Sequence, residues 1–178
     1  MIPKVPVPTL ATDRLRLRAW SDTDIGPLTE INRDPEVAQW LGEPDPSLTG
    51  QRIAGYVEHW RTRGFGQWAV EEAASGVFIG RVGLIHHDDW TASAHDAEIG
   101  WTLSRTVWGR GYATEAARAA LEWAAGRSGL ETIISTTLPG NLRSRRVMEK
   151  LGLTYQGSAV WHGFDQVWYA TRVFRTRS

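Results

Sequence analysis

The sequence contains no cysteine. A disulfide framework, a thiolate nucleophile and a cysteine-based zinc site are therefore excluded. The absence is compatible with the cytoplasm, which is the location that we expect. The chain also lacks an excess of either charge, because Lys and Arg together number 20 and so do Asp and Glu. Without an overall basic field, we expect no nucleic-acid partner and no attachment to an anionic membrane.

Long hydrophobic runs are missing as well. No stretch approaches the roughly 18 consecutive apolar residues of a transmembrane helix, so we expect a soluble protein. The first eight residues hold three prolines and lack the apolar core of a signal peptide, and we interpret residues 1–11 as an extended arm. The composition, 42% hydrophobic and 22% charged, is that of a globular protein. A chain of 178 residues fits one domain, spanning 1–178.

The periodicity of apolar residues predicts an α/β layering with a mixed sheet. Alternation and β-branched content indicate strands over 12–20, 66–72, 77–86, 96–103, 132–138, 154–161 and 166–174. Helical spacing, together with capping oxygens at Ser21 and Asp22 and a closing Gly64, predicts helices over 22–32, 37–41, 53–63, 114–125 and 141–151. The segment from Gly42 to Ser47 and the end of the fourth helix near 126–129 are expected to be loops.

Two glycines, Gly109 and Gly111, stand between the strand that ends at Leu103 and the helix expected from Thr114. Glycine lets the backbone approach a diphosphate closely. The first amides of a helix lack partners within the helix and point at a bound anion. The segment therefore predicts a phosphate-binding loop, with a tight strand-to-helix turn that holds no ligand as the alternative.

Two better-known phosphate loops do not fit this segment. A Walker loop needs Gly-x4-Gly-Lys-Ser/Thr, and no such string occurs in the chain. A dinucleotide fingerprint needs Gly-x-Gly-x-x-Gly, and Thr114 stands at the place of its third glycine. The loop therefore belongs to another class of phosphate site.

The chain resembles the GCN5-related N-acetyltransferases (GNAT), in particular the branch of bacterial ribosomal-protein alanine acetyltransferases. Four segments match that branch in order: its opening strand at 12–18, its fourth strand at 98–101, its pyrophosphate loop and following helix at 108–116, and its second cofactor segment at 141–153. The similarity spans nearly the whole chain. It implies a largely antiparallel, seven-stranded mixed sheet with a V-shaped splay between strands 4 and 5, flanked by about four helices.

The resemblance implies direct transfer of an acetyl group from acetyl-CoA to an amine, without a metal and without a covalent acyl-enzyme. Backbone amides near Leu103 would polarise the thioester carbonyl. Ser144 is the candidate proton donor to the departing thiolate or a hydrogen-bond partner of the cofactor, and Asn141 would bind the pantetheine arm, or cap its helix, or do both. The cofactor-binding residues expected on this basis are Leu103, Trp108, Gly109, Arg110, Gly111, Ala113, Thr114, Asn141, Ser144 and Arg145.

The chain departs from the wider family at two positions. Trp108 replaces the usual Arg or Gln three residues before Gly111, which leaves the diphosphate to backbone amides. Met148 stands where many relatives place a tyrosine that protonates the thiolate, and methionine has no proton to give. Either another residue donates, or the thiolate leaves unassisted because thiols are far more acidic than amines.

An amine attacks only when it is deprotonated, so a base within reach is expected. Glu98 is our candidate for this role, because strand alternation places it on one face with Gly100 and Thr102 beside the thioester. The alternative is a salt-bridged structural glutamate. The expected acceptor-binding residues are His86, in a polar cluster with His87 and Asp88, together with Trp40 and with His162 on the final hairpin loop.

Two other functions stay open from the sequence alone. A catalytically silent acyl-CoA-binding module would keep the fold and the cofactor without turnover. A flavin or nucleotide binder with an accidental loop would gain no thermal protection from coenzyme A. The amine acceptor, a small molecule or a protein N-terminus, has no sequence code in the segments that wall its site. Dimers are the commonest assembly of soluble proteins, so a homodimer is the assembly to test.

Overall fold

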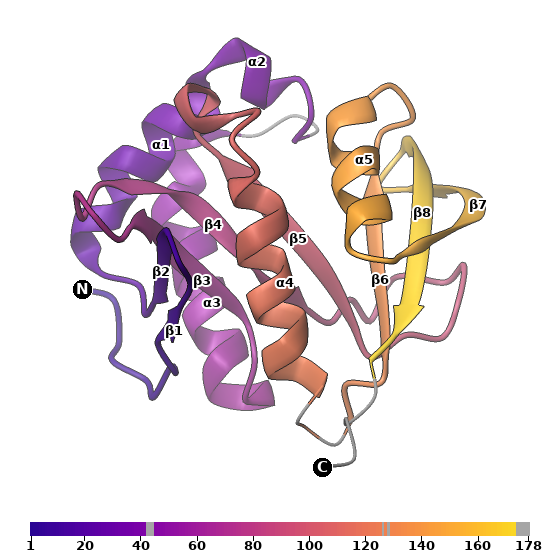
Figure 1. Cartoon of the computed structure of the whole chain (residues 1–178), viewed down its shortest axis with the longest axis horizontal. Coiled ribbons are helices and arrows are strands. Elements are labelled where there is room, and N and C mark those ends of the chain that lie inside the picture. The colour runs from indigo at the N-terminus through magenta and orange to yellow at the C-terminus, as the bar shows by residue number, and fades with distance from the viewer. Residues whose placement is uncertain (42–44, 126, 128, 174–178) are drawn as a thin grey trace.

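The computed structural model describes residues 1–41, 45–125, 127 and 129–173. Within them, eight strands form one sheet in the order β1-β2-β3-β4-β5-β6-β8-β7 (Figure 1). Neighbouring strands are antiparallel except β5 and β6, which are parallel. The strands are β1 (Leu10–Ala11), β2 (Leu15–Arg18), β3 (Gln67–Glu72), β4 (Phe78–Ile85), β5 (Ala97–Leu103), β6 (Thr132–Thr137), β7 (Thr154–Trp161) and β8 (Phe164–Arg172).

The helices begin and end largely at the predicted caps. They are α1 (Ile25–Arg33), α2 (Pro35–Ala38), α3 (Thr49–Arg63), α4 (Tyr112–Ala125) and α5 (Leu142–Lys150), with short 3-10 turns at Asp22–Asp24, Pro46–Leu48 and Arg105–Val107. Ser21 forms a capping box with Asp24 ahead of α1. Gly64 closes α3 in the left-handed conformation at φ 74°, as the sequence predicts.

Several expectations about the elements need correction. The sheet has eight strands instead of seven, because the last two residues of the presumed N-terminal arm pair with β2, and so short a strand leaves no alternation to detect. The described residues form five α-helices, the number that the helical spacing predicts and one more than the resemblance implies. The second helix begins at Pro35 instead of 37, because Asp34 caps it and proline suits a first helical turn. Helix α3 begins at Thr49 and α4 at Tyr112, four and two residues earlier than expected. The predicted loop at 42–44, the helix end at 126 and 128, and residue 174 lie outside the described residues.

Helices cover both faces of the sheet (Figure 1). The alanine-rich side of α4 packs on apolar side chains of β2 to β5, including Leu17, Val82 and Ile99. On the other face, α1 and α3 bury Leu28 and Ile53. No helix among the described residues combines the length and the apolar composition that crossing a bilayer requires.

Strands β5 and β6 are joined by main-chain pairing at two positions only, Ala97 with Ile133 and Glu98 with Ile134. Beyond them the two strands diverge, and the hydroxyl of Ser135 on β6 donates to the carbonyl oxygen of Ile99 at 2.8 Å. This is the V-shaped splay that the resemblance implies. The edge of β5 from Ile99 to Leu103 therefore has no partner strand.

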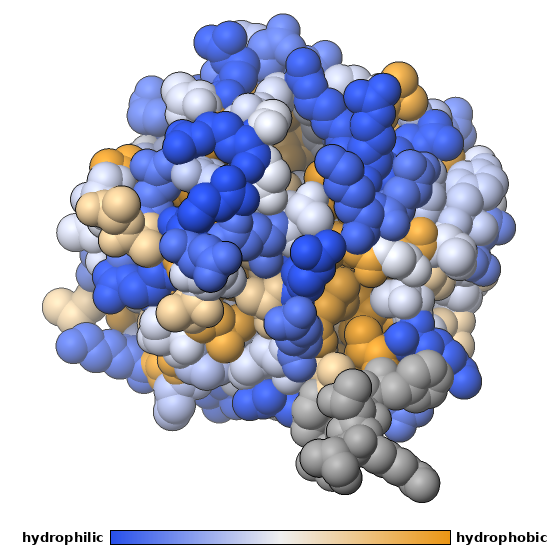
Figure 2. All heavy atoms as spheres, in the orientation of Figure 1, coloured by the Kyte–Doolittle hydropathy of each residue, from blue (hydrophilic) through white to orange (hydrophobic). Residues whose placement is uncertain are grey.

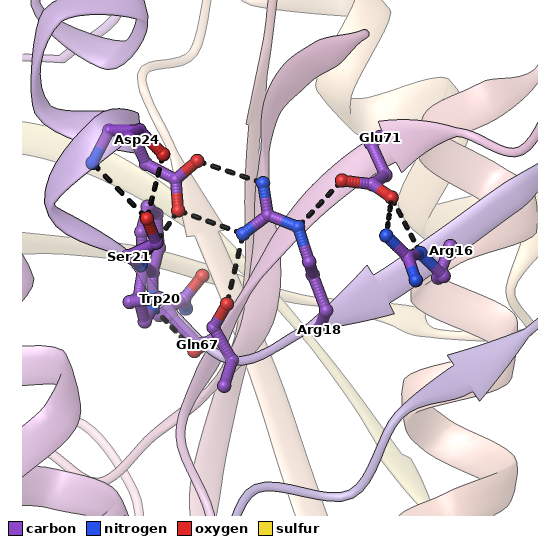
Figure 3. A network of polar contacts seen from close by, with 9 residues as sticks. Arg16, Arg18, Trp20, Ser21, Asp24, Gln67 and Glu71 are labelled. Carbon is purple, nitrogen blue, oxygen red and sulfur yellow. Dashed lines mark hydrogen bonds and ion pairs between the residues drawn. The ribbon is translucent and has the colours of Figure 1, made fainter. Parts of the chain in front are cut away.

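A buried ionic network fixes β2 against β3 and the turn before α1. The guanidinium of Arg18 lies between two carboxylates, those of Asp24 and Glu71 (Figure 3). The side chains of Asp24 and Glu71 are only 3% and 6% exposed. Arg16 pairs with Glu71 from the other side. Each buried carboxylate thus has an arginine partner.

Candidate functional site

A cavity of about 780 Å³ opens where β5 and β6 diverge. Its walls come from β4, β5 and β6, from the loop before α4, and from α2, α5 and the β7–β8 hairpin. Figure 2 shows that the outer surface of this side is largely hydrophilic, with hydrophobic residues visible between α4 and α5. Eleven of the residues expected from the sequence line the cavity: Trp40, Glu98, Leu103, Trp108, Gly109, Gly111, Ala113, Thr114, Asn141, Ser144 and His162.

The loop before α4 presents a run of unused main-chain donors. Among the described residues, no acceptor lies within hydrogen-bonding distance of the N–H groups of residues 109–114, and the first bond of the helix is Glu115 N–H to Gly111 O at 3.0 Å. Gly109 and Gly111 hold φ values of 76° and 82°, which glycine adopts without strain. Arg14 donates to the carbonyl oxygen of Arg110 at 2.9 Å and fixes that peptide. Six N–H groups at a helix start make an anion site.

The free edge of β5 supplies a further donor beside the loop. Ser104 N–H donates to Ile79 O on β4 at 2.8 Å. In an extended strand, successive peptides alternate in direction, so the N–H and C=O of Leu103 point the other way, into the splay. The indole N–H of Trp108 binds the Leu103 carbonyl oxygen at 2.9 Å, and the N–H of Leu103 has no acceptor among the described residues.

Asn141 is the N-cap of α5. Its Oδ1 accepts from Ser144 N–H at 3.2 Å, and its Nδ2 donates to Thr137 Oγ1 at 3.0 Å. The structure therefore shows the capping role that the sequence allowed. Met148 lies further along α5, buried at 1% exposure in the cavity wall. Ser144 is the hydroxyl-bearing residue of α5 that lines the cavity.

The carboxylate of Glu98 is the one carboxylate in the cavity wall among the described residues, and its side chain is 15% exposed. Its Oε2 accepts from His87 Nε2 at 2.8 Å, and its Oε1 accepts from Thr136 N–H at 3.0 Å and from Thr136 Oγ1 at 2.7 Å. Burial raises the pKa of Glu98, but the hydrogen bonds from His87 and Thr136 outweigh it and hold the pKa below its ordinary value. An ionised carboxylate accepts hydrogen bonds only, so His87 Nε2 is the donor.

Replacing His87 by Ala should raise the pKa of Glu98, because it removes one of the hydrogen bonds that lower it. The wild-type carboxylate contributes stability above its unfolded pKa of about 4.3 and loses it as the pH falls through the lower folded pKa. This acid-dependent loss should be smaller in His87→Ala. Carbon-13 NMR titration of the Glu98 carboxyl measures the shift, and an unchanged pKa would contradict the pairing.

Three of the expected site residues lie elsewhere. Arg110 pairs with Glu72 at 3.1 Å. Arg145 is turned toward β8, where its Nε donates to Tyr169 Oη at 3.0 Å. His86 is hydrogen-bonded to the main chain at Asp96 and stacks on His95. None of these three lines the cavity. No group of three His, Asp or Glu side chains in the described part of the chain could hold a metal ion.

His87 lines the cavity, where His86 was expected from the sequence. The sheet register explains why His87, and not His86, faces the cavity. Ile85 pairs with Glu98, so odd positions of β4 share the face of Glu98, and His87 continues that series past the end of the strand. Without the register, the two neighbouring histidines are indistinguishable.

Aromatic rings contribute to the cavity wall. Trp40, which the sequence placed among the acceptor-binding residues, lines the cavity, and so does Trp161 of β7. The indole N–H of Trp161 donates to Asp89 Oδ2 at 3.1 Å. His162, beside it, also contacts Asp89 at 3.1 Å. Asp89 thus ties the β7–β8 hairpin to the loop after β4.

Known proteins share both sequence and fold with this chain. A model of the acetyltransferase (GNAT) domain matches residues 14–154. The YkkB protein of Bacillus subtilis is 32% identical over 148 residues, which cover 82% of this chain and 85% of YkkB. The FsC-acetyl coenzyme A-N(2)-transacetylase of Aspergillus fumigatus is 30% identical over 158 residues, covering 83% of this chain and 66% of that enzyme.

Two solved structures extend the comparison. An acetyltransferase from Agrobacterium tumefaciens superposes with a TM-score of 0.80 at 28% identity, covering 96% of this chain and 98% of that one. The ribosomal-protein-S5-alanine acetyltransferase of Vibrio fischeri superposes with a TM-score of 0.76 at 18% identity, covering 97% and 100%, and shares the fold. The resemblance drawn from the sequence is confirmed.

Proposed function

The chain belongs to the GNAT acetyltransferase family, and from that membership we propose that it transfers an acetyl group from acetyl coenzyme A directly to a primary amine of a small molecule or a protein N-terminus. The observation that carries the proposal is the set of six unused N–H groups at residues 109–114. They form a site for a diphosphate that requires no cationic side chain. The relative from Aspergillus fumigatus, whose name includes acetyl coenzyme A, supports the choice of acyl donor.

The residues divide the reaction among them. Acetyl coenzyme A supplies the acetyl thioester. The amides of the α4 loop hold the diphosphate, and the open edge of β5 receives the pantetheine arm. The N–H of Leu103 polarises the thioester carbonyl oxygen. Nitrogen then forms its bond to the carbonyl carbon as the carbon–sulfur bond breaks, and the electron pair leaves on sulfur.

Glu98 and His87 form the proposed proton-accepting pair. A glutamate is ionised at neutral pH at its ordinary pKa, and the lowered pKa of Glu98 keeps it so. Glu98 takes the ammonium proton of the acceptor, directly or through one water. His87 holds the carboxylate in place through Nε2. The nitrogen loses a second proton as the amide forms, and we assign Ser144 to relay it: the hydroxyl gives its proton to the thiolate and takes up the one that nitrogen loses, a role that Met148 cannot fill.

Coenzyme A at about 100 times its Kd should raise the free energy of unfolding by about 2.7 kcal/mol, and Gly111→Val should abolish this gain. Valine at a φ of 82° is strained and bends the loop that presents the amides. Gly152→Val is the matched control, because Gly152 has a φ of 84°, open space around it and no place in the cavity wall. Thermal unfolding with and without coenzyme A measures the effect. Equal protection of both variants would contradict the loop as the diphosphate site.

A catalytically silent coenzyme-binding module is the second candidate, and the buried Met148 favours it. The two functions differ in one measurement. Release of free thiol from acetyl coenzyme A, in a screen of amines, amino acids and N-terminal peptides, identifies the enzyme. Protection by coenzyme A without thiol release in any mixture identifies the module. For either function, the proposed location is the cytoplasm.

A further inference from the structure

Arg81 is a cation in the cavity wall without a carboxylate partner. It lies on β4, and no carboxylate of the described residues comes within 4.0 Å of its guanidinium. By contrast, Arg16 and Arg18 on the same sheet both pair with Glu71. Arg81 Nη1 donates to Gln67 Oε1 at 3.1 Å, which uses one of its five N–H donors.

Arg81 lies on the face of the sheet that carries Glu98. The register pairs Arg81 with Thr102 and Ile85 with Glu98, and residues four apart on a strand share a face. The coenzyme loop lies on the other side, where α4 packs. The guanidinium therefore belongs to the acceptor end of the cavity and is separate from the diphosphate site.

Two further donors surround Arg81. The hydroxyl of Thr102, a residue only 5% exposed, has no hydrogen-bond partner among the described residues. The Nε2 of Gln67 likewise donates to no described residue, while its Oε1 is taken by Arg81. All three side chains line the cavity. A buried hydroxyl without a partner costs free energy, which a ligand acceptor oxygen would recover.

The remaining electrostatics also point to an anion. Glu98 is the one carboxylate of the described cavity wall, and His87 and Thr136 already engage it. A polycationic acceptor would meet Arg81 with no carboxylate to offset the repulsion. A carboxylate would receive the bidentate pairing that a guanidinium favours.

We propose that the amine acceptor carries a carboxylate, which Arg81, Gln67 and Thr102 bind while its amino group faces Glu98. The inference rests on the proposed function and names its substrate class. The body of the acceptor contacts the aromatic ring of Tyr56, over which the Arg81 guanidinium lies. An aromatic amino acid is the simplest molecule of this description.

The test is a comparison of matched acids and amides. L-phenylalanine, L-tryptophan, L-leucine and 3-phenylpropionate, each with its carboxamide, are titrated into the protein saturated with coenzyme A, and binding is followed by calorimetry. We expect at least one acid to bind on the order of tenfold more tightly than its amide in the wild type, because hydrogen bonds to a charged partner are the stronger kind. Arg81→Gln should remove this preference, whereas Arg61→Gln, at an exposed site on α3, should keep it.

Two outcomes would overturn the proposal: no acid of the panel binding more tightly than its amide, or a preference that survives in Arg81→Gln. Far-ultraviolet circular dichroism and a thermal melt establish that the variant is folded. If Arg81→Gln is unfolded, Arg81→Lys replaces it. Lysine keeps the charge but cannot form the bidentate pairing of a guanidinium, so this variant should retain only part of the preference for the acid over the amide. Binding does not require turnover, so the two proposals fail separately. An acid preference without acetyl transfer would refute the proposed function and show only that Arg81 binds a carboxylate, whereas acetyl transfer without an acid preference would refute this inference alone.

Discussion

Replacing Glu98 by Gln will lower kcat/KM for acetyl transfer by roughly 10²- to 10⁴-fold, the usual contribution of a positioned general base. The amide cannot take the ammonium proton of the acceptor. It still fills the same space, and its oxygen still accepts from Thr136. The effect should be concentrated in the chemical step, so protection by coenzyme A should remain that of the wild type. Initial rates from thiol release, measured across pH, give the comparison.

Glu122→Gln is the matched control for this substitution. Glu122 is an exposed residue of α4 that does not line the cavity, and we expect the variant to turn over at the wild-type rate. A Glu98→Gln enzyme within a few-fold of the wild type would show that Glu98 is a structural carboxylate. In that case His87 and Thr136 would hold it for stability, which is the alternative that its hydrogen bonds also permit.

Replacing Arg18 by Ala will lower the free energy of unfolding by about 3–5 kcal/mol, the usual cost of removing one partner from a buried ion pair. Among the residues that the structure describes, Asp24 would keep only the Ser21 N–H as a partner, at 2.9 Å, while its carboxylate stays buried. Glu71 would keep Arg16. Urea unfolding measures the change, which is large against the 5–15 kcal/mol of a typical domain.

Arg33→Ala provides the control for the loss of an arginine as such. Arg33 pairs with Glu30 on the surface of α1, where the two side chains are 59% and 73% exposed, and such pairs contribute about 0–1 kcal/mol. If the two variants lost equal free energy of unfolding, the Arg18 network of Figure 3 would contribute no more stability than an exposed ion pair. A triple variant, Arg18→Met with Asp24→Asn and Glu71→Gln, should recover part of the loss because no unpaired charge remains buried.

The sequence predicted what local chemistry decides. The cap at Ser21, the closing glycine of α3 and the glycine turn before α4 each depend on a few neighbouring residues, and the structure has all of them. Strand β1 and the early start of α2 were missed, because pairing with a distant strand and the side chain of Asp34 determine them. Local patterns do not contain such contacts.

The same division holds within the site. The glycine turn of the proposed diphosphate loop was predicted from Gly109 and Gly111, because glycine spacing indicates backbone shape directly. His86 and Arg145 were expected in the site but do not line the cavity. For His86 the face of the strand end was uncertain by one position, and for Arg145 the direction of the side chain around the helix was uncertain. Arg81 gave no signal at all, since its significance is the absence of a partner, which only the register of β4 with β3 and β5 reveals.

The two pairing positions between β5 and β6 have a mechanical consequence. Beyond Ala97 and Glu98, no main-chain pairing between β5 and β6 joins the half of the sheet that carries α4 to the half that carries α5. A molecule that binds to both helices would therefore hold the two halves together. Glu98 lies where β5 and β6 are still paired, and it accepts hydrogen bonds from Thr136 on β6. The residue proposed to accept the proton is thus also one of the few that join the two halves.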